Sequence, residues 1–295
     1  MTPRLIAAAT ACLPLMLAAS AHAQSVFDIP DEEAETYIDL GAAVVSRAAY
    51  VGSEEDDLNI FPYAAGEYQG RLWLNPAIGA GVNVINNGVV TLSPFVGFAS
   101  GRDADDTPFV FDPEDLDAGE VPGVAGGVTP VALTDLTDDA FELDSSVTAG
   151  GLFNVLLPFA RLDVAAVTPV TGDIEGIRSD ISLTTRLPVG PFFFAPGVRA
   201  TWMSDAWVES YYGFTTDQVG LLQALDFSDA DIAAGLNPDD AWTLGAHAIV
   251  TYEIVDDVQI IGALNYSDLQ GDAADSPFSP DDTALTAVLG VAKRF

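Results

Sequence analysis

Side-chain character alternates with a period of two along residues 285–295. The odd positions carry Leu, Ala, Leu, Val, Lys and Phe, whereas the even positions carry Thr, Val, Gly, Ala and Arg. Successive side chains of a β-strand point to opposite faces, so this segment has one apolar face and one face of mostly small or polar residues. A strand of this kind that ends in an aromatic residue, here Phe295, is typical of the last strand of an outer-membrane barrel. The pattern therefore predicts a barrel, since a bilayer admits only helices and closed barrels.

The same two-faced pattern recurs through much of the chain. Aromatic residues such as Trp202, Trp242 and Tyr252 stand at the ends of the apolar faces, where the interfacial girdles of a membrane barrel belong. Arginines fall on the small-residue face, which suits a polar lumen and disfavours the alternative of a buried sandwich. Eleven candidate strands result, near 37–50, 58–69, 71–85, 89–100, 145–157, 159–170, 177–187, 191–203, 242–254, 258–269 and 284–295.

The fold expected from these segments is all-β: a transmembrane antiparallel up-and-down β-barrel of ten to twelve strands with long acidic outer loops. A bacterial barrel needs an even number of strands. Either 58–85 is one irregular crossing, or a further strand lies in 104–143. Short turn signals alternate with long connections at 101–143, 204–241 and 270–283, and long connections are expected outside the cell. One or two short helices are expected within 218–235.

The first 23 residues are predicted to be a cleaved signal peptide. Arg4 gives the positive start, an apolar run follows, and Ala21 and Ala23 frame a small-residue cleavage site. A lipoprotein cysteine at Cys12 is disfavoured because the apolar run continues through it. Residues 24–36 would then be a periplasmic tail and residues 37–295 the barrel. Since Cys12 is the chain's one cysteine, no disulfide framework is possible.

Charge narrows the range of functions. The formal net charge is −34, yet hydrophobic residues make up 49%, so apolar and intensely acidic segments must alternate. No segment after the signal offers eighteen uncharged apolar residues, which excludes a helical span. Nucleic acid is excluded as a partner because its phosphates need Lys and Arg. The acidic runs lack the spacing of a calcium loop, so solvated loops are preferred to bound Ca²⁺ or Mg²⁺ that would bridge to lipopolysaccharide.

A polar belt is predicted inside the lumen. Hairpin registers centred on the turns at 188–190 and 255–257 bring five residues of the small or polar face to similar heights: Arg178, Asp180, Arg199, His247 and Asn265. Cations in a narrow, partly dehydrated space need acceptors such as Asp180, so a largely occluded lumen is expected. His247 is the one histidine after the signal, without a Gly-x-Ser-x-Gly turn or a second histidine. We therefore predict no catalytic residue, no metal site and no cofactor.

Specific segments resemble a known family. Residues 269–277, Leu-Gln-Gly-Asp-Ala-Ala-Asp-Ser-Pro, closely resemble the LxGDAADSP segment of the MipA/OmpV family, named for the MltA-interacting protein. Residues 50–53 with 62–63, 101–106 and 211–215 agree with the same family, and the similarity runs from about residue 37 to the end. The acidic segment 106–141 departs from it, because that loop is usually shorter.

The resemblance implies an outer-membrane barrel without catalytic residues. The family's namesake is regarded as a scaffold that joins a murein-degrading lytic transglycosylase to a bifunctional murein synthase. The leading hypothesis is thus a non-enzymatic scaffold in the outer membrane of a Gram-negative cell, in contact with lipid and lipopolysaccharide. The alternative is a small channel for solutes or ions. Phe295 is expected to be read by the barrel-assembly machinery.

Overall fold

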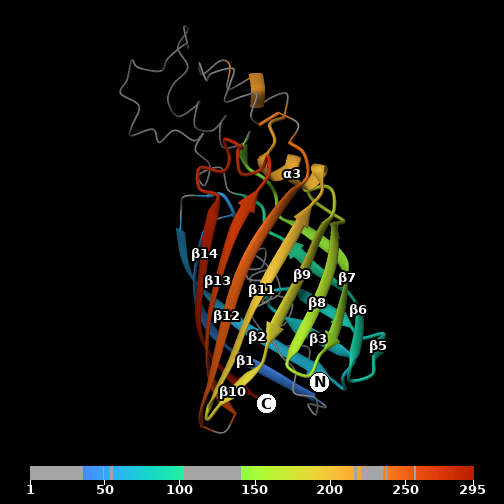
Figure 1. Cartoon of the computed structure of the whole chain (residues 1–295), viewed down its shortest axis with the longest axis vertical. Coiled ribbons are helices and arrows are strands. Elements are labelled where there is room, and N and C mark those ends of the chain that lie inside the picture. The colour runs from blue at the N-terminus through green and yellow to red at the C-terminus, as the bar shows by residue number, and fades with distance from the viewer. Residues whose placement is uncertain are drawn as a thin grey trace, which may run out of the picture.

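Fourteen strands and the helix α3 (Asp205–Tyr212) make up the named elements of the computed structural model, which describes residues 36–48, 50–53, 56–102, 141–215, 218–220, 223, 235–236, 238–255 and 257–295. The strands run up and down around a single wall (Figure 1). They are β1 (Thr36–Ala48), β2 (Asp56–Tyr68), β3 (Leu72–Asn75), β4 (Gly79–Val82), β5 (Ile85–Asn86), β6 (Val90–Ala99), β7 (Ser146–Leu156), β8 (Ala160–Pro169), β9 (Arg178–Thr185), β10 (Leu187–Val189), β11 (Phe192–Met203), β12 (Ala241–Val255), β13 (Val258–Gln270) and β14 (Thr283–Arg294).

The sheet closes on itself. β1 pairs with β14, as in Asp39↔Arg294, and the start of the chain's barrel also exchanges backbone hydrogen bonds between Ile38 and Phe295. β9 pairs with β11, which completes a ring of twelve strands, while β5 and β10 are short additions beside β6 and β11. All neighbours are antiparallel, so every strand in the ring has a partner on each side. The predicted transmembrane antiparallel barrel is confirmed, with twelve strands.

The twelfth strand comes from a segment that was expected to be one strand. Residues 71–85 fold back at 76–78 into the two four-residue strands β3 and β4, with Leu72 opposite Val82. Both explanations offered for the odd strand count were therefore wrong: 58–85 is three strands, and the even number needs no strand from 104–143. The period-two pattern continues through Pro76 because the turn itself contains apolar residues. The turn is stabilised by the Asn75 Oδ1 atom, which accepts a hydrogen bond from the Ala77 backbone N–H at 2.8 Å.

Two ends of the barrel can be distinguished. At the turn end, hairpins close within a few residues, for example after β7 and before β11, and both Thr36 and Phe295 lie there. At the loop end, the connections are long and include α3 (Figure 1). The expected signal peptide, the tail up to residue 35, all of 103–140 and most of 218–235 lie outside the described residues. Within the described part, no helix is long and apolar enough to cross a membrane.

The outward face carries the apolar stripe that the sequence pattern predicts. Trp202 lies opposite Trp242 near the loop end, and Phe192 lies opposite Tyr252 near the turn end with ring centroids 4.8 Å apart. Ten residues of β11 separate the two aromatic levels, about 33 Å at about 3.3 Å per residue. A tilt of about 40° reduces this to roughly 25 Å along the membrane normal, the height of an outer-membrane apolar band. Large apolar side chains such as Val198 (58% exposed) and Leu244 (51%) fill the interval.

The wall has one short seam. β2 meets β3 through 66↔74, 67↔73 and 68↔72, and β4 meets β6 through Ala80↔Val96 and Gly81↔Phe95, whereas β12 pairs with β13 along nearly its whole length. Fewer ladder hydrogen bonds hold this part of the wall, so it is expected to open locally at lower free energy than the rest.

We predict that backbone amides of β3 and β4 exchange with solvent deuterium at least about tenfold faster than those of β12 and β13, a difference of about 1.4 kcal/mol in opening free energy. Hydrogen–deuterium exchange of the barrel in lipid nanodiscs measures this. Equal protection in the two regions would contradict a weak seam.

Candidate functional site

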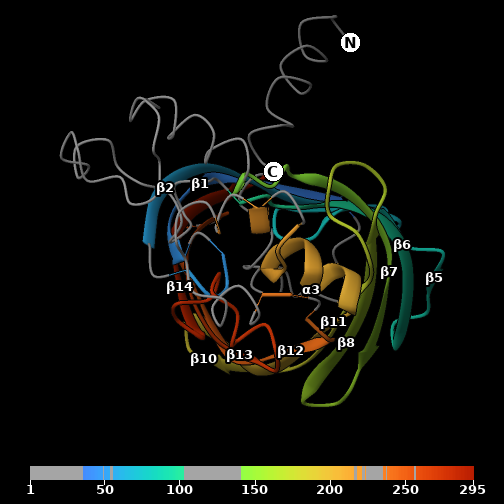
Figure 2. The ribbon, with the colours of Figure 1, turned by 90° about the horizontal axis from the view of Figure 1, so that it is seen from above.

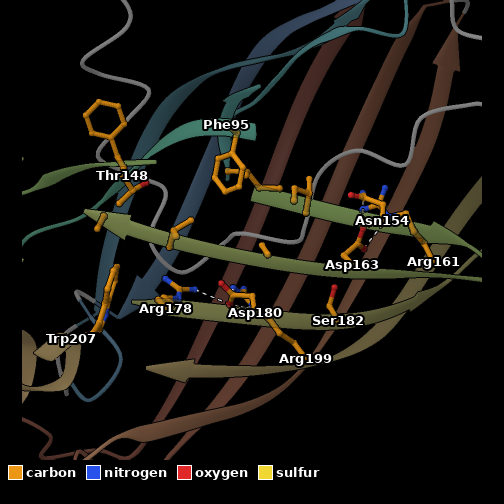
Figure 3. A pocket seen from close by; sticks show the side chains of 16 residues that line it. Phe95, Thr148, Asn154, Arg161, Asp163, Arg178, Asp180, Ser182, Arg199 and Trp207 are labelled. Atoms are coloured by element: carbon orange, nitrogen blue, oxygen red, sulfur yellow. Dashed lines mark hydrogen bonds and ion pairs between the residues drawn. The ribbon is translucent and has the colours of Figure 1, made fainter. Parts of the chain in front are cut away.

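On the lumen wall, the carboxylate of Asp180 bonds two arginines, one on its own strand β9 and one on the neighbouring strand β11. Asp180 accepts hydrogen bonds from Arg178 Nη2 at 3.1 Å, from Arg199 Nε at 3.0 Å and from the Thr201 hydroxyl at 2.7 Å, and Arg199 also contacts it through Nη2. The side chains of all three charged residues are only 10–14% exposed. Figure 3 shows Arg178 and Arg199 on either side of Asp180. Removing such charges from water is tolerable because each has an opposite charge and a hydrogen bond.

This arrangement follows from strand register. Arg178, Asp180 and Ser182 alternate on the inward face of β9, and β11 pairs antiparallel so that Thr201 stands opposite Asp180 and Arg199 opposite Ser182. A two-residue diagonal therefore separates Arg199 from Asp180, a distance that an arginine side chain spans. Local sequence alternation and one hairpin register are enough to build the contact.

A second charged group lies nearer the turn end. Arg161 on β8 donates to Asp163 from Nε, and Asn154 on β7 donates to the same carboxylate at 2.8 Å. The Asn154 Oδ1 atom is buried and accepts no hydrogen bond within the described residues. Because β7 and β8 place Asn154 opposite Asp163, these side chains face the lumen together (Figure 3).

The other two residues of the expected belt, His247 and Asn265, lie next to each other but do not bond the arginines. His247 on β12 stands opposite Asn265 on β13 and opposite Gly197 on β11. Its Nε2 is 2.9 Å from the Thr184 hydroxyl, and its ring covers Gly197, where a Cβ would lie 2.4 Å from Nε2. The structure thus brings Arg178, Asp180 and Arg199 into one contact, and places His247 and Asn265 beside it on neighbouring strands without a bond to those three. His247 carries no carboxylate partner among the hydrogen bonds described.

The loop end is closed by a helix that the sequence interpretation missed. α3 packs inside the ring of strands when the barrel is viewed from above (Figure 2), and Trp207, Val208, Tyr211 and Tyr212 are buried, with Val208 0% exposed. We call this helix with the three rings packed around it the plug; the rings are Phe141, Phe214 and Phe278. The signal was present as apolar residues at i, i+1, i+4 and i+5, a helical period inside a segment that was expected to be an outer connection.

Hydrogen bonds fix the plug to the wall. The Tyr212 hydroxyl donates to the Val51 carbonyl at 2.8 Å, and the Tyr211 hydroxyl donates to the Ser100 carbonyl. Burial raises the pKa of both phenols above the ordinary value of 10.0, so both remain neutral donors at physiological pH. The Ser276 hydroxyl donates to the Tyr212 carbonyl at 2.7 Å, which ties the final outer connection to α3.

An arginine packs against this aromatic cluster. Arg102 is 4% exposed and donates to the backbone carbonyls of Tyr211 and Phe141. Its guanidinium carbon lies 4.0 Å from the centroid of the Phe278 ring and 5.7 Å from that of Tyr50. Backbone dipoles and ring faces both stabilise a buried cation. Arg102 therefore joins three segments that are distant in sequence.

A series of cavities that share lining residues extends from the turn end to the plug. The one nearest the turn end has a volume of about 240 Å³ and is lined by residues of the turns after β2 and β5, among them Gly70 and Gly88. It shares Asn154 and Arg161 with a second cavity, which in turn reaches Trp207 of the plug. Among the described residues, four arginines (Arg161, Arg178, Arg186 and Arg199) and three acids (Glu67, Asp163 and Asp180) line these spaces.

Comparison with known proteins gives a family. A family model described as "MltA-interacting protein MipA" matches residues 40–295. The curated relatives named "MltA-interacting protein", from Escherichia coli (strain K12) and Shigella flexneri, are each 26% identical over 151 residues, 51% of this chain and 57% of the relative. The chain thus spans a little over half the length of the curated relatives it matches.

Solved structures with a similar outline are much more distant in sequence. The NanC porin has a TM-score of 0.43 with 9% identity, covering 86% of this chain and 98% of that chain. An outer membrane channel from Pseudomonas putida F1 has a TM-score of 0.38 with 11% identity, covering 91% and 100%. At these values the similarity says nothing about what the lumen of this barrel holds.

We predict that Asp180→Asn lowers the free energy of unfolding by about 3 kcal/mol or more, because it leaves two adjacent guanidinium groups without their shared carboxylate. Urea unfolding of the barrel in lipid vesicles, followed by tryptophan fluorescence, measures the loss. Asp173→Asn, at an exposed position beyond β8, is the matched control and should change stability by less than about 0.5 kcal/mol. Equal effects of the two variants would rule out a special role for the Asp180 contact.

We further predict that the unchanged protein gives no steady conductance in planar bilayers and that Val208→Asp produces open-channel steps. A carboxylate at a fully buried position of the plug has no partner and would drive α3 out of the lumen. Glu209→Ala, on the exposed side of the same helix, is the control and should remain silent. Large steps from the unchanged protein would show that the plug does not close the barrel.

Proposed function

The chain belongs to the MipA family, and from this premise we propose that it is a non-enzymatic outer-membrane barrel that holds murein-remodelling enzymes at the membrane. The family match covers almost the whole barrel, from β1 to the C-terminus. Family membership and the apolar outward belt both support an outer-membrane location.

The observation that carries the proposal is the closed loop end. A barrel that served chiefly for diffusion would keep a water-filled path, whereas here buried rings and the helix α3 occupy the mouth. What remains accessible is the turn end and the outer surface. A protein of this form acts through the surfaces it presents.

The nature of the partners follows from the relatives' name. The curated relatives are named for an interaction with MltA, and the family resemblance implies a murein lytic transglycosylase and a murein synthase as partners. For this chain both enzyme classes are proposed partners at the turn end. This requires that the turn end face the periplasm, as the short hairpins of outer-membrane barrels do, and that Asn87 lie on that side.

Other parts of the proposal concern assembly and surroundings. Residues 1–23 would be cleaved as a signal peptide, and residues 24–36 would extend the periplasmic surface. Phe295 is 65% exposed at the end of β14, with the Lys293 ammonium 5.1 Å from its ring centroid, a position from which the assembly machinery could read it. The acidic outer connections would lie against lipopolysaccharide.

A channel for small solutes or ions is the second candidate. It is favoured by the series of cavities that reaches from the turn end to Trp207. Conduction would then require the plug to leave its place, with at least six buried aromatic side chains losing their packing. A closed resting state is therefore common to both candidates.

Two exposed apolar residues on either side of β8 allow a matched test of the docking surface. Phe159, 84% exposed, precedes β8 at the turn end, and Val170, 58% exposed, follows it at the loop end. We predict that the tagged, detergent-extracted protein captures a purified murein lytic transglycosylase. Phe159→Ser should weaken capture at least about fivefold, as expected for loss of one apolar anchor worth about 1 kcal/mol.

Val170→Ser should leave capture unchanged. Failure of the unchanged protein to capture either the transglycosylase or the synthase would refute the scaffold role. Equal losses from the two variants would place the docking surface elsewhere than the turn end.

A further inference from the structure

The cavity at the turn end combines features that no role as a scaffold requires. Its lining includes two arginines, Arg161 and Arg186, together with the indole of Trp73 and the hydroxyls of Thr91 and Ser93. A scaffold needs only its outer surface. We propose that this cavity is a binding site for a small sugar acid that enters from the periplasm.

The two arginines stand close enough to act on one anion. Arg161 on β8 lies opposite Thr184 on β9, and Arg186 follows Thr184 by two residues on the same inward face. The two are therefore diagonal neighbours across adjacent strands, roughly 7–8 Å apart at their origins. Guanidinium groups present planar pairs of donors that match a carboxylate, so two of them converging from one wall form an anion-binding edge.

Charge distribution supports an anionic ligand. Among the described residues, the lining of this cavity includes two arginines and one acid, Glu67, within a chain whose formal net charge is −34. Asp163, which is bonded to Arg161, lies outside this lining, so the described cavity wall itself offers an anion two guanidinium groups for one carboxylate.

Hydroxyl groups on the ligand would satisfy the remaining polar atoms. The buried Asn154 Oδ1, which accepts no hydrogen bond within the described residues, lines this cavity and needs a donor. Other amides of the cavity are already used: Asn83 donates to the Gly70 carbonyl at 3.0 Å and accepts from the Ser93 hydroxyl at 2.6 Å. They hold the cavity's shape, whereas Asn154 offers a vacant acceptor.

One wall of the cavity is a fixed aromatic plane. Trp73 packs against Phe95 with ring centroids 5.9 Å apart, and it covers Gly81, where a Cβ would lie 2.3 Å from the indole Cζ2 atom. Small-molecule sites combine such apolar planes with a few placed polar groups. The volume of about 240 Å³ lies below the roughly 300–1,000 Å³ of drug-sized pockets, which suits a single sugar ring.

The test compares a sugar acid with its neutral counterpart on the purified full-length barrel. Isothermal titration calorimetry should detect binding of D-glucuronate, while D-glucose and sulfate bind at least about tenfold more weakly. D-glucose lacks the carboxylate of D-glucuronate, and sulfate lacks its sugar ring. Equal binding of glucose would overturn the role of the anion, equal binding of sulfate would overturn the role of the sugar, and no binding of glucuronate would overturn the site.

Variants then locate the site. Arg186→Gln should weaken glucuronate binding at least about tenfold, whereas Arg71→Gln, which removes the same charge from the exposed turn after β2, should not. Equal losses of glucuronate affinity in the two variants would indicate a general electrostatic attraction of the anion to the turn end and would refute binding in the cavity. The ligand comparison needs no variant to fold, and it is independent of enzyme capture, so the sugar-acid site and the scaffold role can fail separately.

Discussion

The closure of the sheet is the constraint on which the rest of the molecule depends. In a bilayer every backbone donor and acceptor must be satisfied within the protein, and a β-sheet achieves this only by returning to its first strand. Here β14 reaches β1 through a ladder from Asp39↔Arg294 to Ser46↔Ala287. Closure fixes which side chains face lipid and which face the lumen, because register and alternation leave no freedom once the ring is complete.

Two different ways of filling the lumen follow from that division. Opposite walls contribute different side chains: β1, β2 and β11 to β14 supply an apolar cluster that includes Tyr63, Ile249 and Val288, whereas β7 to β9 supply the arginines and their carboxylates. The charged group is stable because each guanidinium meets a carboxylate or a carbonyl, and the apolar wall excludes water from the other side. The lumen is therefore filled by side chains from both walls, with a series of cavities between them, one of which lies at the turn end.

The sequence was sufficient for the features that depend on local alternation. The lipid-facing stripe of β12, the aromatic level at Trp202 and Trp242, and the inward positions of Arg178, Asp180 and Arg199 all follow from period two and short turns. The sequence was insufficient where the alternating pattern continues through a turn. Residues 71–85 keep alternating through the turn at 76–78, so one strand was expected where the chain makes a short hairpin. The five-residue belt was predicted only from the heights of the residues along the barrel axis. Which of them bond depends on the length and direction of each side chain: Arg199 bonds Asp180, whereas His247 contacts Thr184.

The plug was missed for a different reason, and that reason bears on function. Outer connections are normally hydrophilic, and this one begins with Ser204 and Asp205 and is followed by a strongly acidic stretch, so composition favoured a solvated loop. Yet one face of the helix is apolar and is buried in the mouth of the barrel, where it does not contact lipid; this face consists of Trp207, Val208, Tyr211 and Tyr212. Asp205 and Glu209 on the opposite side of the helix are exposed to water, while the apolar face packs inward beside Arg102, which donates to the Tyr211 carbonyl. In the described lumen the arginines of β8, β9 and β11 are held by the carboxylates of Asp163 and Asp180. Because the plug fills the loop end, the cavity proposed for a small anion lies at the opposite end of the described barrel, where Ile38 and Phe295 exchange backbone hydrogen bonds.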